Sequence, residues 1–433
     1  MKYSFYNTFI PYRDKFALYN TFEQKVIFIE EGLKDLLNNK SCDEIKIIHP
    51  EFFNYLFDNN FILNSKEDEL EKVKKLSKKI DGDLTTFMLI VNPTMNCNFK
   101  CWYCYESHIK SSRMKESEIN KIKLLIDKIT FEKELINFNL YFFGGEPLLY
   151  FDKIVVSLID YCSELCEKRN KNLHISFTTN GFLINKSFIN YFKSRNKTCH
   201  LQITFDGYGE EHDKVRYVNK TKGSYYQIVD NIKLLINNQF RVTARVNYTD
   251  ENIADTGKIA DDFKDVNPEI IEKYLRFDFH RVWQNDNGKE ISKILAYELQ
   301  SMKEKGIKTA CIRTVNNVLD SCYADKRNSV VVNFNGDIFK CTARDFSSNN
   351  RVGYLSNNGE LIWKDNHLEE RMNSKFRNAP CLKCELLPIC NGGCSQHAIE
   401  HLKKNEEYCI YGGKEEKDKV LLAKIDEIVE NIQ

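Results

Sequence analysis

The sequence lacks an excess of charge, a long apolar run and an export signal. Its 63 Lys and Arg residues nearly balance 62 Asp and Glu residues, giving a net charge of +1, so no overall field recruits nucleic acid. No apolar run reaches membrane-spanning length. Polar and charged residues interrupt the N-terminal stretch MKYSFYNTFIPYRDKF, which excludes a secretory signal. With 42% hydrophobic residues among 433, we expect a globular cytoplasmic protein of two or three domains, without membrane or nucleic-acid partners.

Cysteine, in contrast, is abundant. The chain has fifteen cysteines, and in a reducing compartment dense, regularly spaced cysteines indicate metal or redox chemistry rather than disulfides. Ten of them fall into two spacing patterns. Buried packing is the default role for the other five, which are scattered: Cys42, Cys162, Cys166, Cys199 and Cys311.

The middle of the chain, residues 85–285, alternates strand and helix patterns. Amphipathic stretches such as SEINKIKLLIDKI separate the strands, with Ser117 as a candidate helix cap. Alternating strands and helices predict an α/β fold with parallel strands, a partial (β/α)6 TIM-like barrel whose chemistry lies at the carboxyl ends of the strands. The predicted strands are 87–94, 138–145, 173–181, 201–207, 242–249 and 274–282.

The flanking regions are smaller. Residues 1–80 predict two strands joined at Arg13 and Asp14, followed by helices, a combination that suits a winged-helix-like module. Residues 286–320 predict a mostly helical bridge. Residues 321–433 predict a cysteine-rich domain with short strands, closed by an amphipathic helix over KEEKDKVLLAKIDEIVENI whose apolar stripe packs in the core.

The first cysteine pattern is CNFKCWYC, directly after the first predicted strand. Cys97, Cys101 and Cys104 are spaced C-x3-C-x2-C. Thiolates ligate iron–sulfur clusters, and three of them leave one iron of a [4Fe–4S] cube open to a small molecule. The motif resembles that of the radical S-adenosylmethionine (radical SAM) enzymes; a zinc site and chance clustering are the alternatives. The resemblance implies that the open iron chelates SAM and that the reduced cluster releases a 5′-deoxyadenosyl radical, which abstracts hydrogen from substrate.

Further stretches match the same family at the ends of successive strands. FFGGEPLL resembles the GGEP motif, in which Glu146 and local carbonyls would receive the SAM ammonium and the glycines let the backbone approach a ligand. TTNG at 178–181 and DGYGEEHDKVR match later strand ends, with Arg216 as the candidate for the SAM carboxylate and with Asp206 and His212 as structural residues. The cofactor-binding residues implied in this way are Tyr103, near adenine, Gly144, Gly145, Glu146, Pro147, Thr179, Asn180 and Arg216, with Arg245 and Asn247 as second candidates.

The second cysteine pattern lies in the C-terminal region. Read alone, its C-x2-C and C-x3-C spacings suggest a zinc ribbon, but the whole pattern resembles the SPASM domain of a radical SAM subgroup, apart from a shorter final gap. That resemblance implies two auxiliary [4Fe–4S] clusters, one held by Cys322, Cys341 and Cys394 and the other by Cys381, Cys384, Cys390 and Cys409. Cys311 could supply a fourth ligand to the first of these clusters. Otherwise Cys311 is a buried thiol and the site is open and could bind a substrate thiolate.

The resemblance implies a maturase of ribosomally made peptides that forms a thioether or carbon–carbon crosslink. Residues 1–80 would then recognise the leader of a precursor peptide by strand addition, with a packing role as the alternative. Flavodoxin or ferredoxin would donate electrons. A rival is an anaerobic sulfatase-maturing enzyme, which makes formylglycine and has an acid directly after the cysteine of G-x4-C. Here Thr342 follows Cys341, and the nearest acid, Asp345, is the one weak catalytic candidate. A non-enzymatic electron carrier or zinc protein would need neither the GGEP motif nor an open cysteine site.

Overall fold

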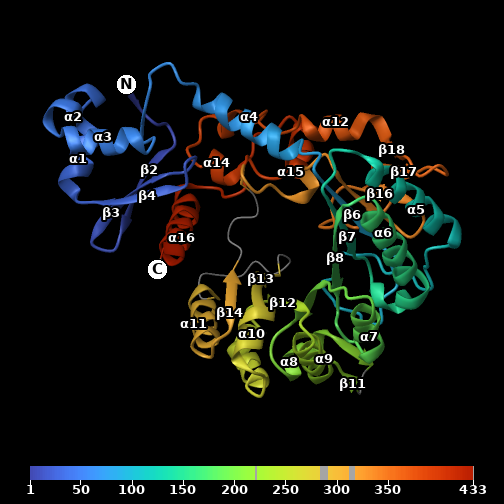
Figure 1. The fold of residues 1–433 in the computed structure, drawn as a ribbon. Helices are drawn as coiled ribbons and strands as arrows, with labels where there is room; N and C mark the ends of the chain where they lie inside the picture. Colours follow the sequence, from blue (N-terminus) through green and yellow to red (C-terminus); the bar gives the residue numbers. More distant parts are fainter. Residues whose placement is uncertain (220–221, 283–290, 312–316, 433) are drawn as a thin grey trace. The chain divides into compact units, whose positions relative to one another are not determined.

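The computed structural model describes residues 1–219, 222–282, 291–311 and 317–432 (Figure 1). The chain forms two compact units. Unit 1 comprises residues 1–83, 313–327 and 366–433, and unit 2 comprises residues 84–312 and 328–365.

The centre of unit 2 is a mostly parallel sheet. Its strands follow the order β14-β13-β12-β9-β8-β7-β6-β15-β16-β17-β18. The six predicted parallel strands are confirmed and lie side by side in chain order, as β6 Thr86–Val91, β7 Asn137–Phe142, β8 Asn172–Thr179, β9 His200–Phe205, β12 Arg241–Tyr248 and β13 Leu275–Arg281. The carboxyl ends of these strands therefore meet at one edge, and the predicted α/β fold class is confirmed.

The sheet has further strands on both sides of the six that were predicted. The bridge expected to be helical contains α11 Ile291–Glu304 but also β14 Lys308–Cys311, which pairs in parallel with β13. On the other side β15 Ser329–Val332 pairs in parallel with β6. Antiparallel strands then continue the sheet as β16 Asp337–Phe339, β17 Gly353–Leu355 and β18 Leu361–Trp363. Residues 328–365, expected in the C-terminal region, therefore belong to the sheet of unit 2.

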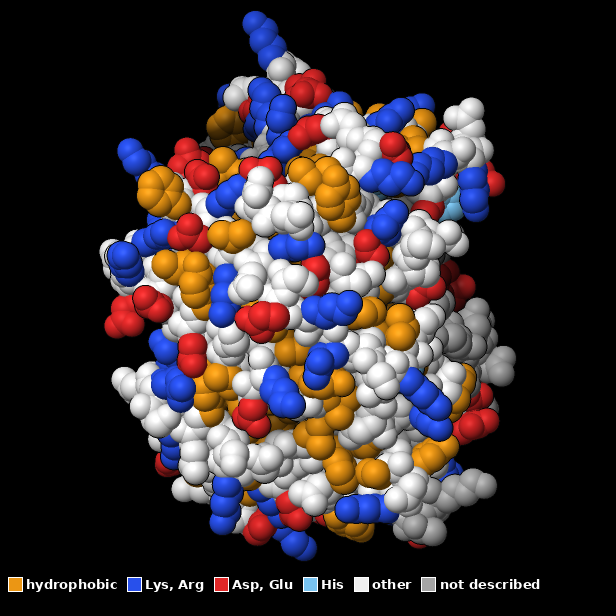
Figure 2. Space-filling view, turned by 90° about the vertical axis from the view of Figure 1, so that its right-hand side faces the viewer, with side chains coloured by type: hydrophobic (Ala, Val, Ile, Leu, Met, Phe, Trp, Pro, Cys, Tyr) orange, Lys and Arg blue, Asp and Glu red, His pale blue; other side chains and the backbone are white. Residues whose placement is uncertain are grey.

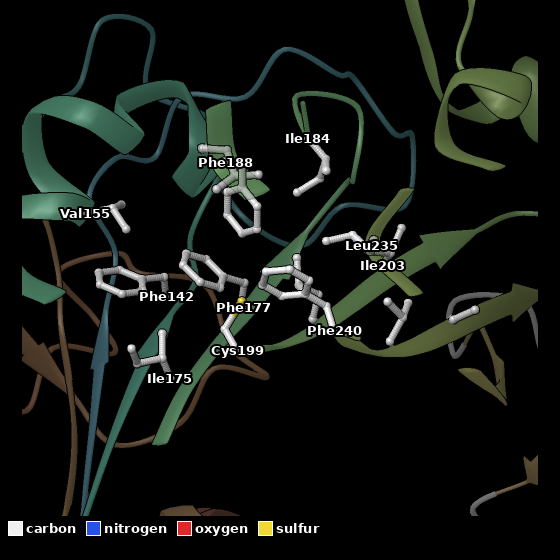
Figure 3. Packing of buried hydrophobic residues seen from close by; sticks show 14 of the residues in the cluster. Phe142, Val155, Ile175, Phe177, Ile184, Phe188, Cys199, Ile203, Leu235 and Phe240 are labelled. Carbon is white, nitrogen blue, oxygen red and sulfur yellow. The ribbon is translucent and has the colours of Figure 1, made fainter. Parts of the chain in front are cut away.

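Helices of unit 2 cover the apolar face of the sheet. The strands alternate, so that Phe138, Leu140 and Phe142 of β7 are all buried. Figure 3 shows Phe142 and Phe177 from adjacent strands packed together, with ring centroids 5.1 Å apart. The elements around these strands are α5 Glu116–Phe131, α6 Val156–Lys168, α7 Lys186–Ser194, α8 Glu210–Val215, α9 Tyr225–Asn237 and α10 Pro268–Tyr274, with short turns of helix at Pro147–Tyr150, Phe151–Val155 and Thr256–Phe263 and a hairpin of β10 Tyr217–Asn219 and β11 Lys222–Gly223.

Unit 1 begins with a small antiparallel sheet. The two predicted strands are β2 Asn7–Tyr12 and β3 Lys15–Asn20, joined at Arg13 in a left-handed conformation, and a third strand, β4 Lys25–Ile29, completes the sheet. β1 Lys2–Tyr3 pairs with β5 Ile62–Leu63. The helices of unit 1 are α1 Glu31–Asn39, α2 Cys42–Ile48, α3 Pro50–Asp58, α4 Glu69–Asp81, α12 His367–Met372, α13 Ala379–Leu382, α14 Leu387–Cys390, α15 Ser395–Leu402 and α16 Lys414–Ile432, with short helical turns Tyr323–Asp325 in unit 1 and Lys364–Asn366 at the boundary between the units.

The N-terminal and C-terminal parts of unit 1 share their cores. Ile10 and Tyr19 of the small sheet pack with Leu421 and Ile425 of the tail helix α16, so the predicted core role of that helix is confirmed. Tyr6 and Val73 pack with residues of the C-terminal part in the same way. The N-terminal module is therefore joined to the C-terminal elements by packing and not only by the chain.

No helix in the described part of the chain is long and apolar enough to cross a bilayer. On the face drawn in Figure 2, Lys and Arg side chains are interspersed with Asp and Glu. This mixture agrees with the nearly neutral composition.

Candidate active site at the carboxyl ends of the parallel strands

The first three cysteines lie on the loop that follows β6. The base of this loop is closed by Thr94, whose hydroxyl lies 2.6 Å from the Ser112 carbonyl oxygen, and by the Met95 amide, which donates to the Ser112 hydroxyl at 2.9 Å. Burial raises the pKa of the Cys97 thiol to about 12 and also raises the pKa of the Cys101 thiol. Free thiols here would stay protonated at neutral pH, whereas bound iron would displace their protons. The donor set therefore fits an iron–sulfur group held by Cys97, Cys101 and Cys104.

The GGEP turn packs directly on the cysteine loop. The Gly145 amide donates to the Thr94 carbonyl at 3.1 Å, and the Glu146 amide donates to the Asn96 carbonyl at 2.9 Å. A Cβ on Gly145 would lie 2.3 Å from the Asn96 carbonyl oxygen, and Gly144 has a positive φ of 99°. Both glycines are thus required by the close approach of two backbones. The sequence predicted an approach to a ligand, but the approach that the structure displays is to the cysteine loop.

Glu146 is completely buried and ties three strand ends together. Its carboxylate accepts hydrogen bonds from the Leu148 amide at 2.9 Å, the Thr179 hydroxyl at 2.8 Å and the Asn180 amide at 2.8 Å. Asn180 in turn donates to Asn98 of the cysteine loop at 2.8 Å. Burial raises the pKa of Glu146 to about 7. Because both carboxylate oxygens are engaged, the contacts of Glu146 in this structure are positional.

Tyr103 is the centre of a second network. Its hydroxyl donates to Asp206 at 2.8 Å and accepts from Arg216 at 2.8 Å and from Asn247 at 2.9 Å. Arg216 also pairs directly with Asp206, and Arg245 donates to Asn247 at 2.8 Å. The structure thus brings together four of the predicted cofactor-binding residues, Tyr103, Arg216, Arg245 and Asn247.

His212 contacts the backbone of Asp206, which agrees with the structural role expected of both residues. The Asp206 amide donates to Nδ1 of His212 at 3.2 Å, and Nε2 of His212 lies 3.0 Å from the Ser224 hydroxyl. Complete burial, with the Arg216 charge nearby, lowers the pKa of His212 well below its usual value. The imidazole is therefore neutral at physiological pH and orients Asp206 without adding charge.

Sequence reasoning missed polar residues on the inner face of β13. Asp278 lies opposite Arg245 and His280 opposite Asn247 in the parallel register. Burial, with the Arg245 charge adding to the effect, lowers the pKa of His280 to about 4, and burial raises that of Asp278. The period-two alternation in YLRFDFHRV was the signal that could have identified both residues.

Two residues directly after the motif were also missed. Tyr105 donates a hydrogen bond of 2.7 Å to the carbonyl of Thr342, the residue after Cys341, and so joins two cysteine loops of unit 2. Burial raises the pKa of Glu106 to about 8, with the Glu146 charge adding to the effect, and its buried Oε2 atom has no hydrogen-bond partner in the described chain. No residue pattern in the sequence marked either position, because both contacts depend on tertiary structure.

Four cysteines of the second pattern line one cavity in unit 1. Cys381, Cys384, Cys390 and Cys409 line it together with Tyr408. Short helices α13 and α14 supply Cys381 and Cys390, Cys384 lies between the two helices, and burial raises the pKa of Cys390 to about 12. Over the described residues, no three His, Cys, Asp or Glu side chains converge tightly enough to hold a single metal ion. Cysteine thiols are the donors that iron–sulfur clusters use, so the lining of the cavity fits such a group.

A buried charge network holds the segments that carry Cys322 and Cys394. Lys375 lies 2.7 Å from Asp81 and 2.9 Å from Asp325. Asp81 accepts from Ser321, next to Cys322, at 2.5 Å, and Asp325 accepts from the amide of Ser395, next to Cys394, at 2.9 Å. Both cysteines thus belong to one framework within unit 1.

The other predicted site residues lie in different parts of the chain. Cys341 lies in unit 2, so its predicted association with Cys322 and Cys394 stays a prediction. The side chain of Cys311 lies outside the described residues, whereas the other scattered cysteines are buried as expected, at Cys42, Cys162, Cys166 and Cys199. Asp345 accepts from the Ser347 hydroxyl at 2.8 Å within its own loop.

Comparison with known proteins identifies the part of the chain that carries this site. Residues 91–263, which include the first cysteine loop, the GGEP turn and the Tyr103 network, match the radical SAM superfamily. These residues form a radical SAM domain.

Two relatives are similar to this chain over different lengths. The chain is 35% identical over 158 residues to a cysteine-type anaerobic sulfatase-maturating enzyme of Clostridium novyi, but this match spans 36% of the chain and only 41% of that protein. It is 25% identical over 413 residues to the radical SAM cyclopropyl synthase TigE of Paramaledivibacter caminithermalis, covering 84% of the chain and 79% of TigE.

Solved structures share the fold. Native anSMEcpe with bound AdoMet aligns with a TM-score of 0.59 at 18% identity, over 80% of this chain and 100% of that one. Streptococcus suis SuiB bound to precursor peptide SuiA aligns with a TM-score of 0.53 at 18% identity, over 92% and 96%. At these identities the similarity shows an α/β fold with a large, mostly parallel sheet.

Proposed function

We propose that this protein is a radical SAM peptide maturase that forms a thioether or carbon–carbon crosslink in a precursor peptide. The observation that carries the proposal is the packing of the three-cysteine loop, the GGEP turn and the Tyr103 network at one edge of the parallel sheet. The four-cysteine cavity of unit 1 supports an enzyme with further clusters. Relatives named as a cyclopropyl synthase and as a sulfatase-maturating enzyme favour a modifying enzyme.

Three [4Fe–4S] clusters and SAM are the cofactors of this proposal. Cys97, Cys101 and Cys104 would hold the first cluster, which together with bound SAM supplies a 5′-deoxyadenosyl radical for hydrogen abstraction. The auxiliary clusters would be held by Cys322, Cys341 and Cys394, with Cys311 as a candidate fourth ligand, and by Cys381, Cys384, Cys390 and Cys409.

The chain's own residues bind and orient. Tyr103 presents its ring beside the cysteines while its hydroxyl is fixed by three partners, so the ring offers a rigid apolar surface for an adenine. Arg216 and Arg245 supply positive charge for a carboxylate at the same strand ends. Thr179 and Asn180 are held by Glu146, and with Gly144, Gly145 and Pro147 they shape the surrounding backbone.

The N-terminal sheet is the proposed leader site. β4 has a partner on one side only, β3, in the described chain, and an edge strand can pair with an extended peptide. Deleting residues 1–80 would also remove part of two cores of unit 1, so hydrogen exchange is the better test. Adding precursor peptide should slow exchange of amides in residues 25–29. Unchanged exchange there, with slowing elsewhere, would assign the module a packing role.

Formylglycine formation is the second candidate. The similarity to a sulfatase-maturating enzyme favours it, whereas the absence of an acid after Cys341 disfavours it, because Thr342 holds that position and Asp345 is bonded within its loop.

The deciding experiment uses anaerobically reconstituted protein with SAM, a strong reductant and small peptides encoded beside the protein. A crosslinking maturase removes two hydrogens from the peptide and leaves a product that does not react with hydrazide, and fragmentation then locates the new bond. A hydrazide-reactive aldehyde would instead establish formylglycine formation. A peptide with neither change, in the presence of 5′-deoxyadenosine, would assign another substrate.

A further inference from the structure

Asn378 is a buried polar residue whose side chain contacts the lining of the four-cysteine cavity in unit 1. It lies directly before α13, where an asparagine commonly caps the helix, but its side chain makes no capping hydrogen bond. The side-chain amide instead donates to the Sγ atom of Cys381 at 2.9 Å. Asn378 is 8% exposed, so little water competes for this contact.

The same carboxamide also binds the segment that carries Cys409. The Nδ2 atom of Asn378 donates to the Tyr408 carbonyl at 2.7 Å, and the Tyr408 amide donates to its Oδ1 atom at 3.3 Å. The Tyr408 hydroxyl in turn donates to the carbonyl of Gly392, which also lines the cavity, at 2.9 Å. Asn378 therefore joins two cysteine-bearing segments that lie thirty residues apart in the chain.

The contacts with Tyr408 fix which end of the carboxamide faces the sulfur. The Tyr408 carbonyl needs a donor and the Tyr408 amide needs an acceptor, so exchanging the oxygen and nitrogen of Asn378 would remove both hydrogen bonds. The nitrogen therefore lies on the side of Cys381. Elsewhere a backbone amide has this role, as that of His397 does for Cys394 at 3.4 Å. The donor at Cys381 comes from a side chain, so a single substitution can remove it.

A hydrogen bond to a ligating sulfur changes the energy of the metal group that the sulfur holds. The reduced form of an iron–sulfur group carries one more negative charge than the oxidised form. Because an N–H group stabilises negative charge on the sulfur, it favours the reduced form and raises the reduction potential. Apolar groups such as Leu386, Leu387 and Ile410 also line the cavity, and in such surroundings a single dipole has a strong effect.

We propose that Asn378 is a positioning residue that raises the reduction potential of an iron–sulfur group in the four-cysteine cavity. It does so by donating to the sulfur of Cys381 and by holding the segment of Tyr408 and Cys409. The proposal rests on the proposed function, which assigns such a group to this cavity. Asn378 itself transfers neither an electron nor a proton.

An anaerobic redox titration of the full reconstituted chain, followed by electron paramagnetic resonance, measures this potential. The signal that disappears in Cys381→Ala with Cys384→Ala belongs to the cavity. Asn378→Leu keeps the approximate size of the side chain and removes its hydrogen bonds. Reduction at the cavity should become about tenfold less favourable in Asn378→Leu, a downward shift of about 59 mV for one electron.

A second variant separates the effect on the sulfur from the holding of Tyr408. The ionised carboxylate of Asn378→Asp still accepts from the Tyr408 amide but cannot donate to sulfur, and it adds negative charge beside Cys381. The potential should therefore fall at least as far as in Asn378→Leu. The matched control is Asn373→Leu, at an exposed asparagine after α12 whose side chain bonds the Glu369 carbonyl. It should leave the potential unchanged.

Hydrogen exchange of the metal-free chain tests the holding contacts without iron. Asn378→Leu should speed exchange of the Tyr408 amide, because its acceptor is lost, and Asn378→Asp should speed it less. Exchange as slow as in wild type for Asn378→Leu would show that Asn378 does not hold this segment.

The outcomes separate this inference from the proposed function. An unshifted potential in both variants, with the cavity signal present, would overturn the role of Asn378 and leave the cluster assignment intact. Loss of that signal in both variants would also overturn it, because Asn378 would then serve assembly and not the potential. If Cys381→Ala with Cys384→Ala removes no signal from iron-loaded protein, the cluster assignment of the cavity fails together with this inference.

Discussion

Glu146 and Tyr103 show how single side chains organise this site. Within the described residues Glu146 makes no ion pair and accepts hydrogen bonds from two amides and a hydroxyl, while Tyr103 bonds a carboxylate, a guanidinium and an amide. Each connects segments far apart in the sequence. Removing either group would leave several buried partners unsatisfied, which is costly in a low-dielectric setting.

The close packing at Gly145 predicts that adding one methyl group there lowers both stability and iron content. Gly145→Ala places a Cβ 2.3 Å from the Asn96 carbonyl oxygen, so the cysteine loop must move. We expect a loss of about 1–3 kcal/mol in stability and loss of iron from the first cysteine site, measured by thermal unfolding and iron analysis. Gly413→Ala, with no atom within 4 Å of the added Cβ, should keep both. Full iron and activity in Gly145→Ala would contradict the packing account.

His280 predicts a pH dependence of stability. Burial and the Arg245 charge lower its pKa from 6.5 to about 4, so between these values the unfolded chain binds a proton that the folded chain does not. The stability that neutral His280 contributes is present above pH 6.5 and is lost as pH falls towards 4.

Urea unfolding at several pH values between 7 and 5 measures this effect. His280→Gln should reduce the loss of stability on acidification by about 1–2 kcal/mol, a value lowered to allow for screening by water. His174→Gln, at an exposed position of β8, should leave the pH profile of wild type. Identical profiles for wild type and His280→Gln would show that this imidazole is not held neutral.

At the scale of single residues, the sequence predicted those candidate site residues that belong to short local motifs. The cysteine loop, the GGEP turn and Arg216 were found because their neighbours in the chain define them. Tyr105 and Glu106 were not found, because Thr342 and Glu146, which define their environment, lie far away in the sequence. Chain order does not reveal such contacts without the fold.

Among the elements, the six parallel strands were predicted because each is an apolar run between turns. β14 was missed because Lys308–Cys311 is short and half polar, and only pairing with β13 makes it a strand. The proposed cap at Ser117 was wrong, because α5 begins at Glu116 after Lys115 without a side-chain cap. Local propensity is a weak guide where tertiary contacts decide.

Removing the buried ion pairs of Lys375 should cause a large loss of stability. Lys375 neutralises Asp81, at the end of α4, and Asp325; although burial raises the pKa of Asp325, this ammonium and Ser395 hold it below its usual value. Lys375→Met removes this cation from two buried carboxylates and should cost about 3–5 kcal/mol. Lys419→Met removes only exposed pairs of α16 and should cost less than about 1 kcal/mol.

Thermal or urea unfolding of both variants measures the difference. Because the network holds the segments of Cys322 and Cys394, Lys375→Met should also lose iron, whereas Lys419→Met should not. Equal stability of the two variants would show that the network does not hold unit 1 together.

For the whole molecule, the metal content tests the two cysteine patterns together. Three [4Fe–4S] clusters require about twelve irons per chain, and Cys381→Ala with Cys384→Ala should lower the count to about eight. Cys199→Ala, a buried cysteine outside both patterns, should keep about twelve. Zinc in place of iron, or an unchanged count in the double variant, would contradict the cluster assignment.

The organisation of the whole molecule was the hardest to predict. The sequence suggested consecutive domains, whereas the chain forms two units that each use separated segments. Residues 328–365 leave the cysteine-rich region to extend the sheet, and the tail helix returns to the N-terminal core. Composition and local pattern do not reveal which distant segment such a strand or helix packs against. These segments have the same amphipathic pattern as others in the chain, and their packing partners lie far away in the sequence.

The central claim is that the cysteine loop at the carboxyl ends of the parallel strands supports reductive cleavage of SAM. The most direct measurement is 5′-deoxyadenosine formation from SAM and dithionite by anaerobically reconstituted protein, comparing wild type with Cys104→Ala. The account predicts 5′-deoxyadenosine from wild type and none above background from Cys104→Ala. Wild-type protein that contains its full iron, is reduced by dithionite and still forms no 5′-deoxyadenosine would contradict it.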